Sequence, residues 1–195
     1  MNLKAYFKKI IRMILMIFFK FEWWHTSPID NRKYAMDIVS KLNARSSRGS
    51  LIEIGCGLGD ILANAKFKKK FFYDLSPNVL RAARFLQNFS KKKSINSFKT
   101  FNFLTDSLDT DLNFDAVVLV NWIHGFESEG LKKSINSIVK NNLNTKGLIV
   151  FDIIENNKDY KFNHAVSDLI DEEKFVITIL DEYPFGRKLV FAELK

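Results

Sequence analysis

The segment from Leu51 to Asp60 constrains the fold of this chain more than any other part of the sequence. It reads Leu-Ile-Glu-Ile-Gly-Cys-Gly-Leu-Gly-Asp, so a short apolar run leads into glycines at every second position. This pattern predicts a buried parallel strand that ends in a tight turn, followed by a helix that begins near Asp60. Glycines let the backbone approach a ligand closely, and the free N–H groups at the start of the helix would point at that ligand. The segment therefore predicts a binding site at the end of a strand.

The spacing of the glycines distinguishes between two kinds of nucleotide-binding turn. The dinucleotide-binding pattern G-x-G-x-x-G would require a glycine at position 60, where this chain has an aspartate. Gly55, Gly57 and Gly59, preceded by Glu53, instead resemble motif I of the class I S-adenosylmethionine-dependent methyltransferases, E/D-x-G-x-G-x-G. The resemblance implies that this loop, with Cys56 inside it, holds the methionine part of the cofactor S-adenosylmethionine, and that Glu53 helps to fix the loop.

Composition indicates a globular protein without disulfides. The chain has 195 residues, of which 47% are hydrophobic, and this is enough for a domain with a substantial core. A single cysteine excludes a disulfide scaffold and suits a reducing compartment, so we expect a cytoplasmic protein. No cluster of Cys and His has the spacing of metal ligands, so we expect no metal site. The net charge of +8 raises the question of nucleic acid or an anionic membrane as a partner.

Residues 2–20 predict an amphipathic helix. Its basic side chains gather on one side at helical spacing, and its apolar side chains gather on the other. The uncharged run 13–19 is too short to span a bilayer, which needs about 20 residues. The helix therefore either lies at a membrane interface or packs on the rest of the protein. We expect residues 1–26 to comprise this helix and an aromatic segment, and residues 27–195 to form a methyltransferase domain.

The aromatic segment is Trp23-Trp24-His25. The resemblance implies that it covers the acceptor, because the N-terminal segment often does so in class I methyltransferases. The alternative is that these rings anchor the first helix, since aromatic side chains most often serve packing.

Strands and helices alternate over the following residues. Ser27-Pro28 predict a helix start, and apolar spacing continues this helix through residues 34–42. We expect strands at 51–54, 71–73, 101–104, 114–120, 148–154, 175–180 and 188–194, and further helices at 60–66, 77–89, 128–142 and 159–171. The last two strands are joined without room for a helix, so they must form a hairpin. The alternation predicts an α/β fold with a doubly wound, mostly parallel seven-stranded sheet. The resemblance implies the same fold, with an antiparallel last strand.

Ligands of such sheets bind beyond the carboxyl ends of the strands, so the residues after each strand are site candidates. Asp74 follows the second strand, and its carboxylate can accept hydrogen bonds from both hydroxyls of a ribose. Asp74 and Leu75 lie in the stretch Tyr-Asp-Leu-Ser-Pro, which is similar to the motif that follows motif I in the methyltransferases. The alternative for Asp74 is a capping role at the next helix.

Asp106 and Ser107 follow the third predicted strand. The resemblance implies that an acid at this position accepts a hydrogen bond from the adenine amino group of the cofactor. Asp109 and Asp111 are close competitors for this role. An acid that only closes a turn is the alternative.

Asn121 and His124 follow the fourth strand, within Asn-Trp-Ile-His-Gly-Phe. The resemblance implies that this segment faces the transferred methyl group and the acceptor, so we assign Asn121 to cofactor binding and to catalysis. We assign His124 as a catalytic base, because imidazole is the usual proton acceptor near neutral pH. The alternative is a histidine that holds the loop. The segment departs from the Asn-Pro-Pro-Tyr and Asp-Pro-Pro-Tyr signatures of many nucleic-acid amino methyltransferases, which argues against a nucleic-acid substrate.

These features together predict a methyltransferase that uses S-adenosylmethionine and acts by in-line transfer on a small-molecule, sugar or lipid-linked acceptor. Residues 1–20 would make peripheral contact with the cytoplasmic face of the membrane. An RNA or ribosomal methyltransferase is one alternative, and it predicts salt-dependent RNA binding by residues 66–99. A cofactor-binding partner protein without catalysis is the other, and it predicts cofactor binding without turnover.

Overall fold

Strands and helices alternate in the computed structural model, which describes residues 3–89, 94–154, 157–181 and 183–195. The strands are β1 (Ser50–Ile54), β2 (Lys69–Asp74), β3 (Ile95–Thr100), β4 (Phe114–Leu119), β5 (Leu143–Ile154), β6 (Phe175–Leu180) and β7 (Arg187–Leu194). The α-helices are α1 (Leu3–Phe19), α2 (Lys33–Ala44), α3 (Asp60–Asn64), α4 (Pro77–Asn88), α5 (Ser128–Asn141) and α6 (Val166–Leu169). Short 3-10 helices are η1 (Trp23–Thr26), η2 (Ile29–Asn31), η3 (Ile123–Gly125), η4 (Glu172–Lys174) and η5 (Pro184–Gly186).

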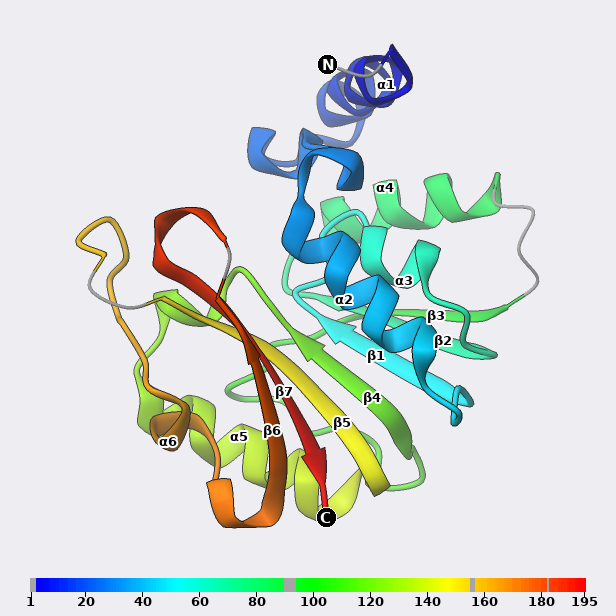
Figure 1. Cartoon of the computed structure of the whole chain (residues 1–195). Helices are drawn as coiled ribbons and strands as arrows, with labels where there is room; N and C mark the ends of the chain where they lie inside the picture. Colours follow the sequence, from blue (N-terminus) through cyan, green and yellow to red (C-terminus); the bar gives the residue numbers. More distant parts are fainter. Residues whose placement is uncertain (1–2, 90–93, 155–156, 182) are drawn as a thin grey trace.

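The strands form one seven-stranded sheet in the order β3-β2-β1-β4-β5-β7-β6 (Figure 1). The pairs from β3 to β5 are parallel, whereas β7 is antiparallel to both β5 and β6. The predicted doubly wound sheet with its reversed last strand is thereby confirmed. The strand order changes direction between β1 and β4, and parallel sheets bind ligands beyond the strand ends at such a point.

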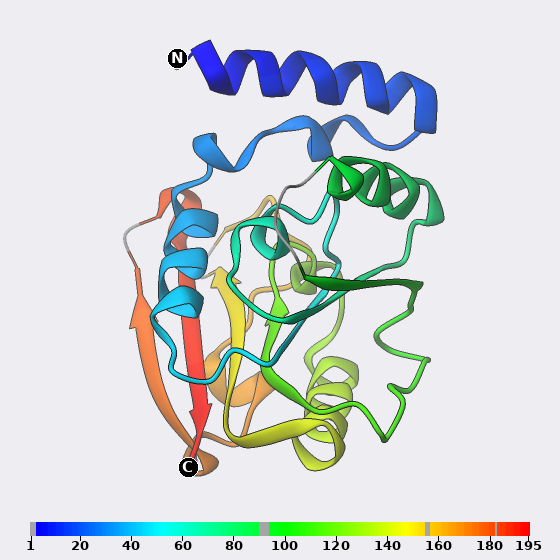
Figure 2. The ribbon, with the colours of Figure 1, turned by 90° about the vertical axis from the view of Figure 1, so that its right-hand side faces the viewer.

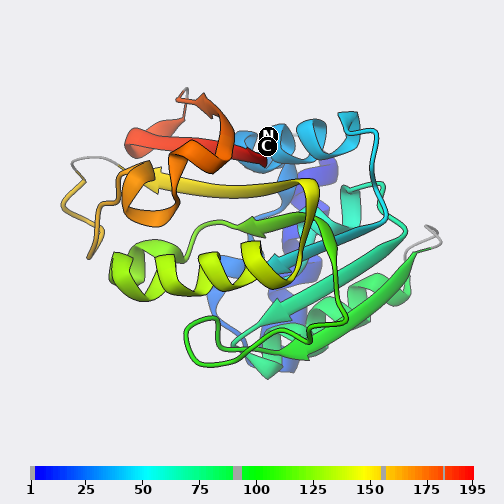
Figure 3. The same cartoon turned by 90° about the horizontal axis from the view of Figure 1, so that it is seen from below.

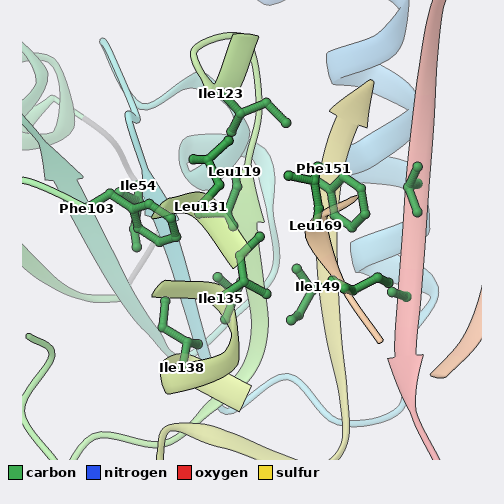
Figure 4. Packing of buried hydrophobic residues seen from close by; sticks show 14 of the residues in the cluster. Ile54, Phe103, Leu119, Ile123, Leu131, Ile135, Ile138, Ile149, Phe151 and Leu169 are labelled. Carbon is green, nitrogen blue, oxygen red and sulfur yellow. The ribbon is translucent and has the colours of Figure 1, made fainter. Parts of the chain in front are cut away.

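The central strands β1 and β4 are buried on both faces, which explains their mostly apolar sequences. Alternate residues of β1 point to opposite faces: Leu51 joins a cluster with α2 and α3, whereas Ile52 joins a cluster with α5. Figure 3 shows α2 and α5 on opposite sides of the sheet. In the α5 cluster, Ile135 and Phe151 are fully buried beside Leu169 of α6 (Figure 4).

The third predicted strand was wrong. Residues 101–104 form a loop, and β3 lies just before them at Ile95–Thr100. The side chains of Phe101 and Phe103 are buried, so this loop has the apolar character of a strand. In contrast, β3 is an edge strand whose side chains are exposed or only partly buried, and it lacks a clear apolar pattern.

The predicted helix over 159–171 was also wrong, because only Val166–Leu169 is α-helical. The described residues before it form a loop held by asparagine side chains. Asn163 Oδ1 accepts a hydrogen bond from the N–H of Asn157 at 3.1 Å, and Asn157 Oδ1 accepts one from the N–H of Asp159 at 2.9 Å. Asparagine offers backbone N–H groups an alternative to helical hydrogen bonds.

The first predicted helix is confirmed as α1, which lies across one end of the molecule above α4 (Figure 2). Leu15 and Phe21 are buried in a small cluster with Leu58 and with Val79 of α4. The aromatic segment that follows α1 forms η1. The helix thus packs on the domain near the start of α3 and above the carboxyl ends of β1 and β2.

Candidate functional site

A cavity of about 670 Å³ opens at the carboxyl ends of β1, β2 and β4. Its lining includes residues 53–58 at the end of β1 and just after it, 74–75 at the end of β2, 101–104 after β3 and 120–122 after β4. Further lining side chains come from η1, α2 and β7, which are distant in sequence from these loops. A concave site of this size is typical of small-molecule binding.

The glycine loop after β1 has the conformation that its sequence predicts. Gly55 and Gly57 have φ values of +72° and +54°, which favour glycine strongly. A Cβ atom on Gly55 would overlap the indole of Trp122, and one on Gly57 would lie 2.8 Å from Nδ1 of His25. The loop thus lies against these two aromatic side chains, which leave no room for a side chain at either glycine.

Gly59 has a different role from the other two glycines. It does not belong to the described cavity lining, and a Cβ atom there would overlap the ring of Phe72 in β2. This glycine therefore permits close packing of the loop on the sheet. Cys56 is buried and lines the cavity, and burial raises the pKa of its thiol well above the usual value.

Asp74 lies at the end of β2, where its buried carboxylate lines the cavity. Asp74 Oδ2 accepts a hydrogen bond from the N–H of Gly57 at 2.8 Å, and Oδ1 accepts one from the N–H of Ser76 at 2.9 Å. The cap of α4 is Ser76, whose hydroxyl accepts from the N–H of Val79. The carboxylate of Asp74 thus holds the glycine loop to β2 and also reaches the cavity beside Leu75.

Glu53 and Arg32 bring unsatisfied polar atoms to the same cavity. Glu53 Oε2 and Arg32 Nε are buried and have no hydrogen-bond partner. Burial raises the pKa of Glu53 well above its usual value, although the charge of Arg32 opposes this shift. The guanidinium of Arg32 also donates to Asp60. Buried polar atoms without partners are rare, so these two groups suit a ligand that carries both an ammonium and a carboxylate.

Asn121 is held in place by a network that the sequence analysis missed. It has a φ of +75°, which is uncommon outside glycine, and its N–H donates to Asp152 Oδ1 at 2.9 Å. Its side-chain Nδ2 donates to the hydroxyl of Tyr34 at 2.6 Å, and its Oδ1 accepts from Arg187 at 2.5 Å. The Arg187 guanidinium also pairs with the fully buried Asp152 and lies 4.6 Å from the centre of the Tyr34 ring.

His124 does not reach the cavity. Its side chain is only 2% exposed, and it is not among the described residues that line the cavity. Its Nε2 lies 3.3 Å from Oδ2 of Asp152, and its ring packs against Tyr160 and His164. This position favours the alternative of a histidine that holds the loop, and the role of His124 as a base that contacts the acceptor stays a prediction.

Asp106 and Ser107 also lie outside the described cavity lining. Asp106 is exposed, and its carboxylate accepts hydrogen bonds from the N–H of Asn102 at 2.9 Å and from the hydroxyl of Thr105 at 3.2 Å. Asp106 thus closes a turn, as the alternative predicts, and a contact of Asp106 or Ser107 with adenine stays a prediction. Residues 101–104 line this part of the cavity instead.

The aromatic segment covers one side of the cavity, where Trp24 and His25 line it. Burial lowers the pKa of His25, although Asp74 and Glu22 oppose this shift. Elsewhere, the described residues bring no three His, Cys, Asp or Glu side chains together in a way that could hold a metal ion.

Comparison with known proteins shows which fold carries this cavity. No family model matches the chain, and no curated protein matches its sequence. TehB from Haemophilus influenzae superposes with a TM-score of 0.67 at 14% identity, over 82% of this chain and 62% of TehB. The N-methyltransferase NodS from Bradyrhizobium japonicum, in complex with S-adenosylhomocysteine, superposes with a TM-score of 0.68 at 17% identity, over 93% of this chain and 97% of NodS.

A third structure extends the same likeness to a sugar methyltransferase. The amino pentose methyltransferase CalS10 from Micromonospora echinaspora, with S-adenosylmethionine bound, superposes with a TM-score of 0.65 at 13% identity, over 91% of this chain and 94% of CalS10. The chain thus has the Rossmann-like fold of the class I methyltransferases.

Proposed function

We propose that the protein transfers a methyl group from S-adenosylmethionine to a small-molecule acceptor. The observation that carries this proposal is the convergence of the glycine loop, Asp74 and the unpartnered atom of Glu53 on one cavity. NodS and CalS10, which share the fold, were solved with S-adenosylhomocysteine and S-adenosylmethionine bound.

The residues of the cavity suit each part of this cofactor. Glu53 and Arg32 offer a carboxylate oxygen and a guanidinium N–H to an ammonium and a carboxylate, such as those of methionine. Asp74 offers acceptors to ribose hydroxyls, and its present hydrogen bonds leave lone pairs free, since a carboxylate has about four. Leu75 and residues 101–104 provide the apolar and amide surface for a base.

The cofactor supplies a methyl group that is already activated on sulfonium, so the protein has to align the acceptor behind this group and exclude water. Tyr34, Asn121 and Arg187 form the polar side of the remaining cavity. Because the Tyr34 hydroxyl accepts from Asn121, its own proton is free to donate to an acceptor oxygen. We assign Asn121 to orienting the acceptor and to contact with the cofactor, while Trp24 covers the cavity.

The finer parts of this function are proposals of the same kind. A sugar or lipid-linked acceptor suits a cavity that combines aromatic rings with hydrogen-bonding groups. We propose residues 27–195 as the catalytic domain of a cytoplasmic protein and residues 1–20 as its peripheral contact with the membrane. The large exposed apolar side chains of α1 support this contact.

Calorimetry with matched variants tests the cofactor assignment. Asp74→Ala should weaken S-adenosylmethionine binding by about 1–3 kcal/mol, because it leaves ligand hydroxyls unpaired. Asp106→Ala is the control, since this acid lies outside the cavity lining, and it should bind like the unaltered protein. Binding of NAD without binding of S-adenosylmethionine would refute the proposal.

Transfer of radiolabelled methyl to cell extracts then tests the acceptor. The extract is separated into lipid, RNA and small-molecule fractions after the reaction. Label in the lipid or small-molecule fraction is expected. Label confined to RNA would instead identify a nucleic-acid methyltransferase, and cofactor binding without any labelling would indicate the partner protein without catalysis.

A further inference from the structure

Helix α1 turns its charged side toward the protein. Arg12 is only 7% exposed, and its guanidinium donates to the carboxylate of Asp60 and to the backbone oxygen of Ser27 at 2.7 Å. One turn earlier, Lys8 Nζ lies 2.6 Å from Oδ2 of Asp30. A helix on the surface of a globular protein ordinarily buries its apolar stripe and exposes its charges. In α1 this arrangement is largely reversed.

The opposite side of α1 exposes large apolar side chains. They follow helical spacing along a single face, and they are Leu3, Phe7, Ile11, Ile14, Ile17 and Phe18. Ile17 and Phe18 are 74% and 78% exposed. Figure 2 shows α1 lying across the end of the molecule, and no other described element covers the side of this helix that faces away from the domain.

The apolar face continues beyond α1 onto α4, and η1 lies beside α1. Phe18, Phe19, Phe85 and Phe89 form a row of rings with successive centroid distances of 5.1, 5.8 and 5.0 Å. Phe18 and Phe89 of this surface, and Trp23 of the neighbouring η1, are each more than 70% exposed. With about 150–250 Å² per aromatic side chain, Phe18 and Phe89 together expose roughly 200–400 Å², which reaches the size of the largest apolar patch of a typical monomer, about 300–600 Å².

The charges beside this surface favour a bilayer over a second copy of the chain. Helices α1 and α4 contain lysine and arginine but no aspartate or glutamate. Lys9, Lys20 and Arg81 are exposed next to the apolar face. Two copies would bring these like charges together, whereas anionic lipid headgroups would neutralise them. No described helix has the length and apolar character needed to cross a membrane.

Trp24 links the apolar surface to the cavity. It is 59% exposed beside Trp23, with a centroid distance of 6.2 Å between the rings, and it also lines the cavity. We propose that α1, η1 and the end of α4 dock on an anionic bilayer. The acceptor is then a membrane-resident amphiphile whose polar head enters the cavity past Trp24. The identity of the acceptor rests on the proposed methyl transfer, whereas the docking does not.

Vesicle co-sedimentation tests the docking. The full chain should bind vesicles of phosphatidylcholine and phosphatidylglycerol, and added salt should weaken this binding. The double variant Ile14→Glu and Phe18→Glu should lose at least about tenfold in affinity, since two large apolar side chains leave the interface. Val176→Glu with Ile179→Glu is the matched control, because it adds the same charge at exposed apolar positions of β6; it should bind like the unaltered protein.

Three outcomes would overturn the docking proposal. One is an unaltered protein that ignores vesicles, and another is equal loss of binding in both double variants. The third is a concentration-dependent dimer, seen by analytical ultracentrifugation, that the α1 variant alone abolishes. Calorimetry with S-adenosylmethionine shows whether the α1 variant is folded, because neither altered residue lines the cavity.

The acceptor is tested by methyl transfer to membranes with labelled S-adenosylmethionine. Label should enter the lipid extract, and the α1 variant should lower its rate of appearance while the β6 variant does not. Label confined to water-soluble compounds would refute a membrane-resident acceptor and leave the proposed methyl transfer intact. Absence of cofactor binding would refute the proposed function and leave vesicle binding as a separate result.

Discussion

Replacing Asp152 with alanine tests the buried network that positions the acceptor side of the cavity. Asp152 is fully buried in β5 and pairs with Arg187, whose side chain is only 12% exposed. It also accepts the N–H of Asn121. Removing one partner of a buried ion pair costs about 3–5 kcal/mol, because the other charge stays buried without compensation. The total stability of a domain is only about 5–15 kcal/mol, so Asp152→Ala should unfold at a much lower urea concentration.

A second substitution separates the charge effect from simple loss of packing. Arg187→Met in the Asp152→Ala background removes the uncompensated guanidinium while keeping an apolar side chain of similar reach. This double variant should recover part of the lost stability, since buried ion pairs can be replaced by apolar residues at little cost. Equilibrium urea unfolding gives the free energies of all variants. A loss of less than about 1 kcal/mol in Asp152→Ala, or no recovery in the double variant, would refute the role of Asp152 as the partner of a buried charge.

Two further predictions concern the loops around the cavity. Gly55→Ala should destabilise the protein by about 2–5 kcal/mol in urea unfolding. A φ of +72° costs about 1–2 kcal/mol, and overlap of the added Cβ with Trp122 costs about 1–3 kcal/mol. Gly125→Ala is the control, because no atom lies within 4 Å of its added Cβ, and a smaller effect of Gly55→Ala than of Gly125→Ala would contradict the prediction. His124→Gln should change the affinity for S-adenosylmethionine by no more than about twofold in calorimetry, because His124 lies outside the described cavity lining. A change of two- to threefold corresponds to less than about 0.7 kcal/mol. A tenfold loss would show that His124 acts on the cavity after all.

The central part of the fold could be predicted because its sequence pattern has one physical cause. Apart from Ser50, Glu53 and Asp115, the residues of β1 and β4 are apolar on both faces, so both strands must be buried between helices. The edge strand β3 lacks this constraint, because half of its surroundings is solvent. Its neighbours Phe101 and Phe103 fill the apolar cluster from a loop, and apolar content alone cannot distinguish such a loop from a strand.

Some residues of the candidate site could likewise be predicted from the sequence, and others could not. Residues directly after β1, β2 and β4 could be predicted, because strand ends of a parallel sheet face the ligand. Arg187 could not, since it reaches the cavity only through the insertion of β7 beside β5. Asp152 lies inside an apolar strand, and only the structure reveals that it contacts Arg187, His124 and the N–H of Asn121.

Glu53 offers the sharpest distinction between a structural and a ligand-binding residue. Burial raises its pKa well above the usual value of 4.5, with Arg32 opposing. A group that binds its proton more tightly in the folded state contributes stability below its ordinary pKa, and this contribution is lost as pH rises through the folded-state pKa. Glu53→Gln carries no charge to bury, so its unfolding free energy relative to the unaltered protein should increase as pH rises above 4.5.

The same substitution should weaken the binding of S-adenosylmethionine. A hydrogen bond to a charged group contributes about 1.5–3 kcal/mol, so loss of the carboxylate that faces the cofactor ammonium should reduce affinity by about 10- to 150-fold. Urea unfolding across pH and calorimetry near neutral pH measure the two effects on one protein. Parallel stability profiles for the two proteins would refute the buried charge, and unchanged affinity would refute the ammonium contact. Higher stability together with weaker binding is expected only if the unsatisfied carboxylate is kept for the ligand, because a purely structural glutamate would lose stability on substitution.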